Sequence, residues 1–153
     1  MRLEYRLLDA AQEYPLLYYY EDISLREVEL RMVCSRFVKL GTAYEKTSVA
    51  QEVMYYVIYL RPVQALQKEQ WPKVPERDVY LEMRHWPTAK SGAELIERTK
   101  VAGDSELLLN LLCDYMQFLG KEWLVQAVEL DEDRGCYIRY VETVDEEAKD
   151  AVE

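Results

Sequence analysis

The sequence is short of the residues that most often carry chemistry. Among its 153 residues are one histidine, three cysteines and five glycines. No glycine-rich phosphate loop or dinucleotide fingerprint occurs. Cys34, Cys113 and Cys136 are odd in number, widely spaced and set among apolar neighbours, which favours buried thiols in a reducing compartment over disulfides or a zinc site. We therefore predict no catalytic residue, cofactor or metal, and an enzyme is the least favoured class of function.

Long hydrophobic runs are also absent. No window approaches the roughly 18 consecutive apolar residues of a membrane span. The first residues, Met-Arg-Leu-Glu-Tyr-Arg, carry charges where a signal peptide needs an apolar stretch. These absences predict a cytoplasmic protein without a membrane partner.

The negative charge is concentrated at the C-terminal end. The net charge is -10, and residues 129–153 hold ten carboxylates against three cations, which leaves only -3 for the rest of the chain. Acidity opposes binding to a phosphate backbone, so nucleic acid is not an expected partner. We expect residues 1–144 to form a single domain and residues 145–153 an acidic, frayed tail.

Residues 53–60, Val-Met-Tyr-Tyr-Val-Ile-Tyr-Leu, are predicted to form a central strand. Both faces of this strand are apolar or aromatic, so both must be covered. A helical stripe also fits, but β-branched and aromatic residues favour a strand. Alternating polarity predicts further strands over residues 2–8, 42–48, 78–86, 123–130 and 136–143.

Two long helices are predicted from caps and apolar stripes. Ser24 with Glu27 forms a capping box, and the stripe behind it runs to Gly41, a plausible C-terminal cap. The second helix begins at Asp104, is apolar over much of its circumference and ends at Gly120, which predicts a core helix. Shorter helices are expected over residues 64–70 and 91–102.

These elements predict an α+β fold with a mainly antiparallel sheet and two principal helices packed on one face. The order helix, glycine, hairpin occurs twice, over residues 24–60 and 104–143, and Cys34 and Cys113 each precede their glycine by seven residues. A duplicated α-β-β unit would explain this pattern. Helix caps and one matched cysteine also arise by chance, so both explanations stay open.

Tyrosine is unusually abundant, with thirteen against two phenylalanines. Tyrosine suits boundaries where the ring is buried and the hydroxyl is wet, which include interfaces and the rims of small sheets. The candidate interaction surface comprises Tyr14, Leu16, Tyr18, Tyr19 and Tyr20, and Pro15 within this segment confines it to an edge, a strand start or a loop. We predict a contact with another protein there, most simply a homodimer; the alternative is that these residues fold inward.

A second hypothesis is a small-molecule-binding domain with an aromatic-lined pocket, for which Trp71, His85 and Trp86 are weak candidates. No sequence motif pairs His85 with a nucleophile or an orienting carboxylate. A deep apolar pocket with converging polar groups would favour this hypothesis. The first hypothesis remains a protein–protein interaction or regulatory module that binds itself or another protein.

Overall fold

The computed structural model describes residues 1–75 and 78–144. The N-terminal unit (residues 1–63) contains β1 (Arg2–Leu7), η1 (Ala10–Gln12), β2 (Leu16–Tyr20), α1 (Leu25–Val33), β3 (Arg36–Lys39), β4 (Thr42–Gln51) and β5 (Tyr55–Val63). The C-terminal unit (residues 80–143) contains β6 (Tyr80–His85), β7 (Leu95–Lys100), α2 (Asp104–Leu112), β8 (Tyr115–Phe118), β9 (Lys121–Asp131) and β10 (Cys136–Thr143). The predicted tail, residues 145–153, lies outside the described residues.

The predicted α+β class with a mainly antiparallel sheet is wrong. The described residues are mostly β, with 49% strand and 15% helix, and their ten strands form one mixed sheet. The strand order is β2-β1-β5-β4-β3-β9-β10-β6-β7, and β8 pairs with β9 beside this path. Strands β1 and β5, β6 and β10, and β3 and β9 pair in parallel. Polarity patterns identify strands but not their partners, so these distant parallel pairs were not predictable.

The first predicted helix is too long, because its apolar stripe continues into a strand. Helix α1 ends at Val33, and the extended Cys34 behind it donates its thiol hydrogen to the carbonyl of Leu30. Gly41 is not a helix cap. With Leu40 it forms a two-residue turn in which both residues have positive φ (50° and 75°), the geometry of a tight hairpin between β3 and β4.

Other predicted boundaries are corrected in the same way. Helix α2 ends at Leu112 and is followed by β8, while the helix predicted over residues 91–102 is strand β7. Residues 64–70 form no helix. The central strand begins at Tyr55 and not at residue 53, because the first two residues of the apolar run lie exposed in the turn before β5.

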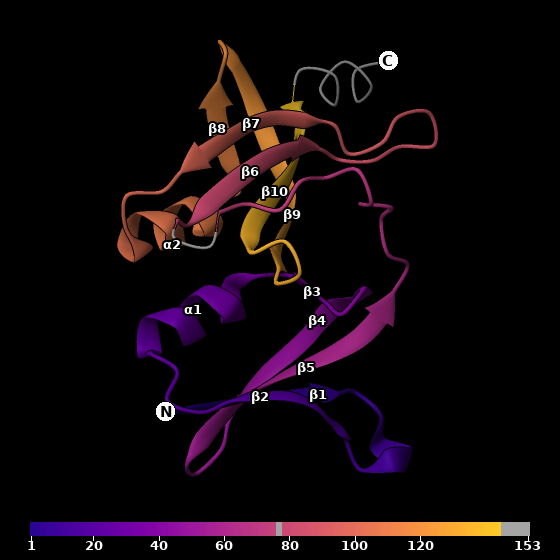
Figure 1. Cartoon of the computed structure of the whole chain (residues 1–153), viewed down its shortest axis with the longest axis vertical. Coiled ribbons are helices and arrows are strands. Elements are labelled where there is room, and N and C mark those ends of the chain that lie inside the picture. The colour runs from indigo at the N-terminus through magenta and orange to yellow at the C-terminus, as the bar shows by residue number, and fades with distance from the viewer. Residues whose placement is uncertain (76–77, 145–153) are drawn as a thin grey trace.

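The two units share one topology, which is longer than the α-β-β repeat considered from the sequence. In each unit the first strand pairs antiparallel with the second and parallel with the last, and the fourth strand lies between the third and the last. The units are joined where β3 pairs in parallel with β9 (Figure 1). The fold is therefore a β-β-α-β-β-β unit present twice in one sheet.

Equivalent residues make equivalent contacts in the two units. The Cys34 thiol donates to Leu30 O and the Cys113 thiol donates to Leu109 O, both at 3.2 Å. Backbone hydrogen bonds from Lys46 N to Ser35 O and from Val125 N to Asp114 O are both 2.8 Å long. The first strands align Leu3, Glu4 and Arg6 with Leu81, Glu82 and Arg84. The correspondence between the units can therefore be traced residue by residue.

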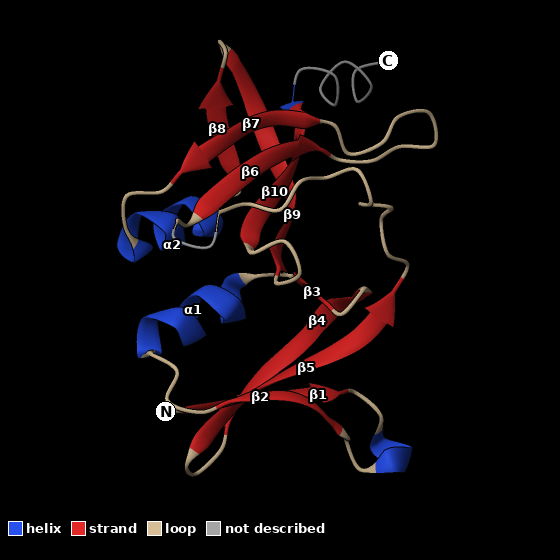
Figure 2. Ribbon diagram, viewed as in Figure 1, coloured by secondary structure: helices blue, strands red, loops and turns tan. Residues whose placement is uncertain are grey.

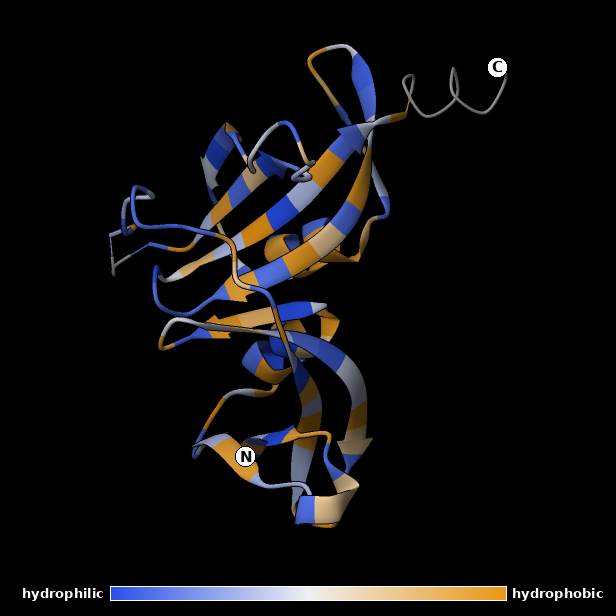
Figure 3. Cartoon of the chain, turned by 90° about the vertical axis from the view of Figure 1, so that its right-hand side faces the viewer, coloured by the Kyte–Doolittle hydropathy of each residue, from blue (hydrophilic) through white to orange (hydrophobic). Residues whose placement is uncertain are grey.

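The helices lie side by side between the two units and share their main core (Figures 1 and 2). Leu30 and Phe37 of the N-terminal unit pack in the same cluster as Leu107 and Leu130 of the C-terminal unit. A second cluster is covered by the connecting segment (residues 64–75 and 78–79). Hydrophobic and polar residues alternate along the strands, as sheet pleating requires (Figure 3).

Candidate functional site

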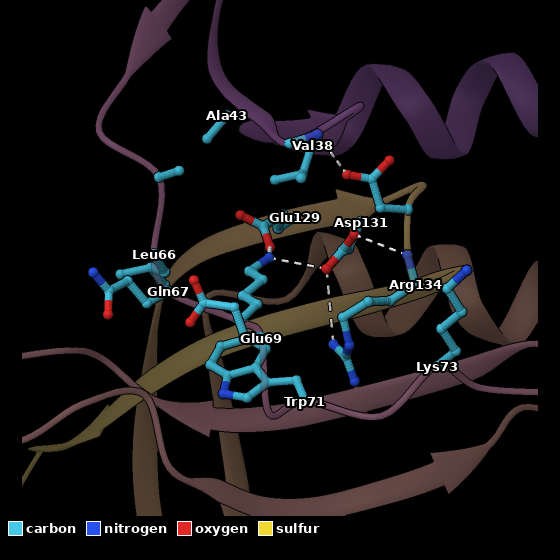
Figure 4. A pocket seen from close by; sticks show the side chains of 14 residues that line it. Val38, Ala43, Leu66, Gln67, Glu69, Trp71, Lys73, Glu129, Asp131 and Arg134 are labelled. Atoms are coloured by element: carbon cyan, nitrogen blue, oxygen red, sulfur yellow. Dashed lines mark hydrogen bonds and ion pairs between the residues drawn. The ribbon is translucent and has the colours of Figure 1, made fainter.

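A cavity of about 490 Å³ lies at the joint between the units. Val38 and Ala43 line it from the N-terminal unit, Glu129 and Asp131 from β9, and Trp71 from the connecting segment (Figure 4). Its lining thus comes from three parts of the chain that are distant in sequence.

Buried carboxylates line the cavity beside a lysine. The Lys68 ammonium donates to Glu129 Oε2 and, at 3.0 Å, to Asp131 Oδ2. Glu129 also accepts hydrogen bonds from Arg36 Nε (3.3 Å) and from the Tyr140 hydroxyl (2.9 Å). Lys68 therefore ties the connecting segment to β9, and Arg36 ties β3 to the same carboxylate.

A second ionic cluster, centred on Glu82, lies next to the Trp71 ring. Glu82 is fully buried and accepts hydrogen bonds from Arg84 Nε (2.9 Å), Arg98 Nη2 (2.7 Å) and Arg134 Nη2 (2.6 Å). Burial alone would raise the pKa of Glu82, but the hydrogen bonds from these arginines outweigh burial and lower the pKa to about 2. The Arg84 guanidinium lies 3.5 Å from the centre of the Trp71 ring, so the cluster also holds the connecting segment.

These contacts account for the buried charges around the cavity without a ligand. Buried charges are costly unless they are paired and hydrogen-bonded, and Lys68, Glu129, Asp131 and Arg134 all find partners within the chain. Over residues 1–75 and 78–144, no group of three or more His, Cys, Asp and Glu side chains is arranged to hold a metal ion. The cavity is therefore explained as part of the ionic joint between the units.

The three weak pocket candidates do not converge on this cavity. Trp71 lines it, but the Trp86 ring packs edge-on against Tyr140, with ring centres 6.1 Å apart. The His85 ring lies at the end of β6, 5.8 Å from the Trp123 ring. The small-molecule hypothesis thus keeps one of its three candidate residues at the cavity.

Residues 14–20 include β2, the strand at one end of the sheet, and their side chains divide between inside and outside. Tyr18 packs edge-on against Phe37, and the Tyr20 hydroxyl donates to Glu132 at 2.6 Å. Tyr14, Leu16 and Tyr19 are exposed. Part of the segment therefore folds inward, as the alternative required, and the homodimer contact through its outer residues stays a prediction.

The two units differ on the outer side of their helices. We define the α2 face as Leu109 and Leu112. Leu109 is 65% exposed, whereas its equivalent in α1, Leu30, is 3% exposed. The α2 face is thus bare where the equivalent residues of the N-terminal unit are buried (Leu30) or half-buried (Val33).

The cover of the N-terminal face comes from the C-terminal unit. Strand β9 pairs with the outer edge of β3, and its Val128 and Leu130 join the cluster that buries Leu30. The inner edge of β8 pairs with β9. The outer edge of β8, which corresponds to the outer edge of β3, pairs with no strand of the described chain. One unit is therefore completed by the other, and the second unit has no such neighbour.

The leucines of this surface are visible in the sequence, where they led to a different prediction. Leucines around most of the second helix predicted a core helix, because a helix that is apolar all round is normally buried. In the structure Leu107 and Leu111 are buried, but Leu109 and Leu112 are exposed on the opposite side. Only the comparison with α1 reveals these leucines as an uncovered face.

Comparisons of the chain with protein-family models, with curated proteins and with solved structures found no match. Neither α1 nor α2, the two α-helices of the described chain, is long and apolar enough to cross a membrane.

Proposed function

We propose that this protein is a protein–protein interaction module that binds its partner through the α2 face. One observation carries the proposal: the same surface of the same fold is buried at Leu30 and bare at Leu109. Exposed leucines on a helix beside an unpaired strand edge are typical of protein contacts.

The free edge of β8 supports the same assignment. An unpaired strand edge offers backbone donors and acceptors to an incoming strand, and proteins usually protect such edges with charges. Strand β7, at the opposite end of the sheet from β2, carries Glu97, Arg98 and Lys100, whereas the sequence of β8 is Tyr-Met-Gln-Phe. A partner that adds a strand to β8 and covers the leucines of α2 would complete the unit as β9 completes the other.

Site-specific photo-crosslinking in the organism that encodes the chain tests this proposal. A photoreactive residue at Leu112, which is 56% exposed, is compared with one at Leu25 on α1, which is 55% exposed. We expect a discrete covalent adduct from position 112 and none from position 25. Introducing Leu109→Glu into the first variant should abolish the adduct.

Two results would refute the proposal. One is the absence of any adduct from position 112, and the other is the same adducts from both positions. Mass spectrometry of the adduct identifies the partner chain, which separates self-association from binding to a different protein.

A further inference from the structure

The internal joint between the units indicates what kind of strand the α2 face accepts. In the N-terminal unit, Arg36, Phe37 and Val38 of β3 pair in parallel with residues 129–131 of β9. The Ser35 hydroxyl accepts a hydrogen bond from Val128 N (3.0 Å) and donates one to Val128 O (3.2 Å). At this joint the later half of the fourth strand of one unit (β9) therefore pairs in parallel with the third strand of the other unit (β3).

The N-terminal unit contains an unused counterpart of this half-strand. Residues 49–51 of β4 correspond to residues 128–130 of β9. The strand pairing shows this: Ala50 lies opposite Val57 of β5, and Glu129 lies opposite Ile138, the equivalent residue of β10. β3 covers only residues 42–45 on the outer edge of β4. Beyond them, no other strand of the described chain pairs with that edge, and Val49 is exposed.

Each of the two strand edges that form the joint thus has an equivalent in the described chain that is unpaired. The acceptor half is β8 with the α2 face, and the donor half is residues 49–51 of β4. The two halves do not pair with each other within the chain. We infer that they pair between chains: the β4 edge of one copy adds in parallel to β8 of a second copy and covers Leu109 and Leu112. This inference rests on the proposed function and names the partner.

The side chains at the two free halves suit such a contact. On the donor, Val49 opposes Ile58 and corresponds to Val128, which contributes to the main core in the internal joint. On the acceptor, Asp114 corresponds to Ser35, and its carboxylate can accept a hydrogen bond from an incoming backbone N–H, as the serine hydroxyl does.

The contact between chains lacks the ion pair of the internal joint. Arg36 and Glu129 correspond to Tyr115 and Ala50, so the contact relies on apolar area and backbone hydrogen bonds. We expect it to be weaker than the internal joint and to depend on protein concentration. Because donor and acceptor are different surfaces, the contact is head-to-tail and produces chains of copies or a closed ring.

Complementation between two variants tests this geometry. Leu112→Glu disables the acceptor and leaves the donor intact, whereas Val49→Glu does the reverse. Both positions are exposed, and circular dichroism checks that each variant keeps the fold. In sedimentation velocity at micromolar to submillimolar concentration, wild type should associate and each variant alone should be monomeric. An equimolar mixture should form a heterodimer and nothing larger, while Leu25→Glu should behave as wild type.

Each other outcome overturns the inference in a recognisable way. A monomeric wild type, or association that neither substitution weakens, excludes the head-to-tail contact. If Leu112→Glu abolishes association while Val49→Glu alone still associates like wild type, the α2 face pairs with itself, so the inference fails while the proposed function stands. A crosslinked adduct from position 112 that contains a different protein has the same meaning.

Discussion

Glu82→Gln should be among the most destabilising isosteric changes in the chain. The substitution keeps the shape of the side chain but removes the negative charge at the centre of three arginines. Arg84 and Arg134 are buried and would lose their shared counter-charge. Removing one partner from a buried ion pair costs about 3–5 kcal/mol, a large part of the stability of a domain of this size.

The acidity of Glu82 leads independently to a similar magnitude. Its pKa falls from 4.5 to about 2 on folding, and at about 1.4 kcal/mol per pKa unit this corresponds to about 3 kcal/mol. Because the folded pKa is the lower one, this stability is present above pH 4.5 and is lost as the pH falls to about 2. Glu82→Gln should remove that part of the pH dependence.

The assay is urea unfolding of wild type, Glu82→Gln and the matched variant Glu4→Gln. Glu4 holds the equivalent place in β1, but its partners Arg2 and Arg6 are partly exposed, so its loss should cost only about 1 kcal/mol. A free energy of unfolding for Glu82→Gln within about 1 kcal/mol of the wild-type value would contradict the role assigned to Glu82. An equal loss of free energy of unfolding in Glu4→Gln and Glu82→Gln would contradict it as well.

Three further predictions concern other parts of the chain. Burial raises the pKa of the Cys34 and Cys136 thiols to about 12, and Cys113 is exposed, so a thiol reagent at neutral pH should modify one cysteine per folded chain and three after denaturation; rapid modification of two folded thiols would contradict this. Gly41→Ala should lower the free energy of unfolding by about 1 kcal/mol, because φ is 75° there although no atom crowds the added methyl group; calorimetry showing no loss would count against the turn. Tyr19→Ser should weaken any homodimer formed through β2 while preserving the melting temperature, and a dimer indifferent to this change in sedimentation would remove that contact.

Local signals in the sequence were sufficient for many elements but not for their ends. Alternating polarity identified β1, β6, β9 and β10, and the Ser24 cap identified the start of α1, because these patterns depend on neighbouring residues alone. Both helix ends were missed, since apolar spacing in Phe37 and Val38 satisfies a helix and a strand alike. The choice between them was decided by pairing with β4 and β9, which the local sequence does not contain.

The candidate site depended on tertiary structure almost entirely. Nothing in the local sequence distinguishes Glu82 from a solvated carboxylate. Its burial results from the parallel pairing of β6 with β10 and from arginines on two strands and a turn. The sequence determined that the second helix is apolar over much of its circumference and that helix, glycine and hairpin recur. Which of the two equivalent helix faces is covered was decided only when β9 joined β3, because one strand can complete one neighbour and leaves the second face bare.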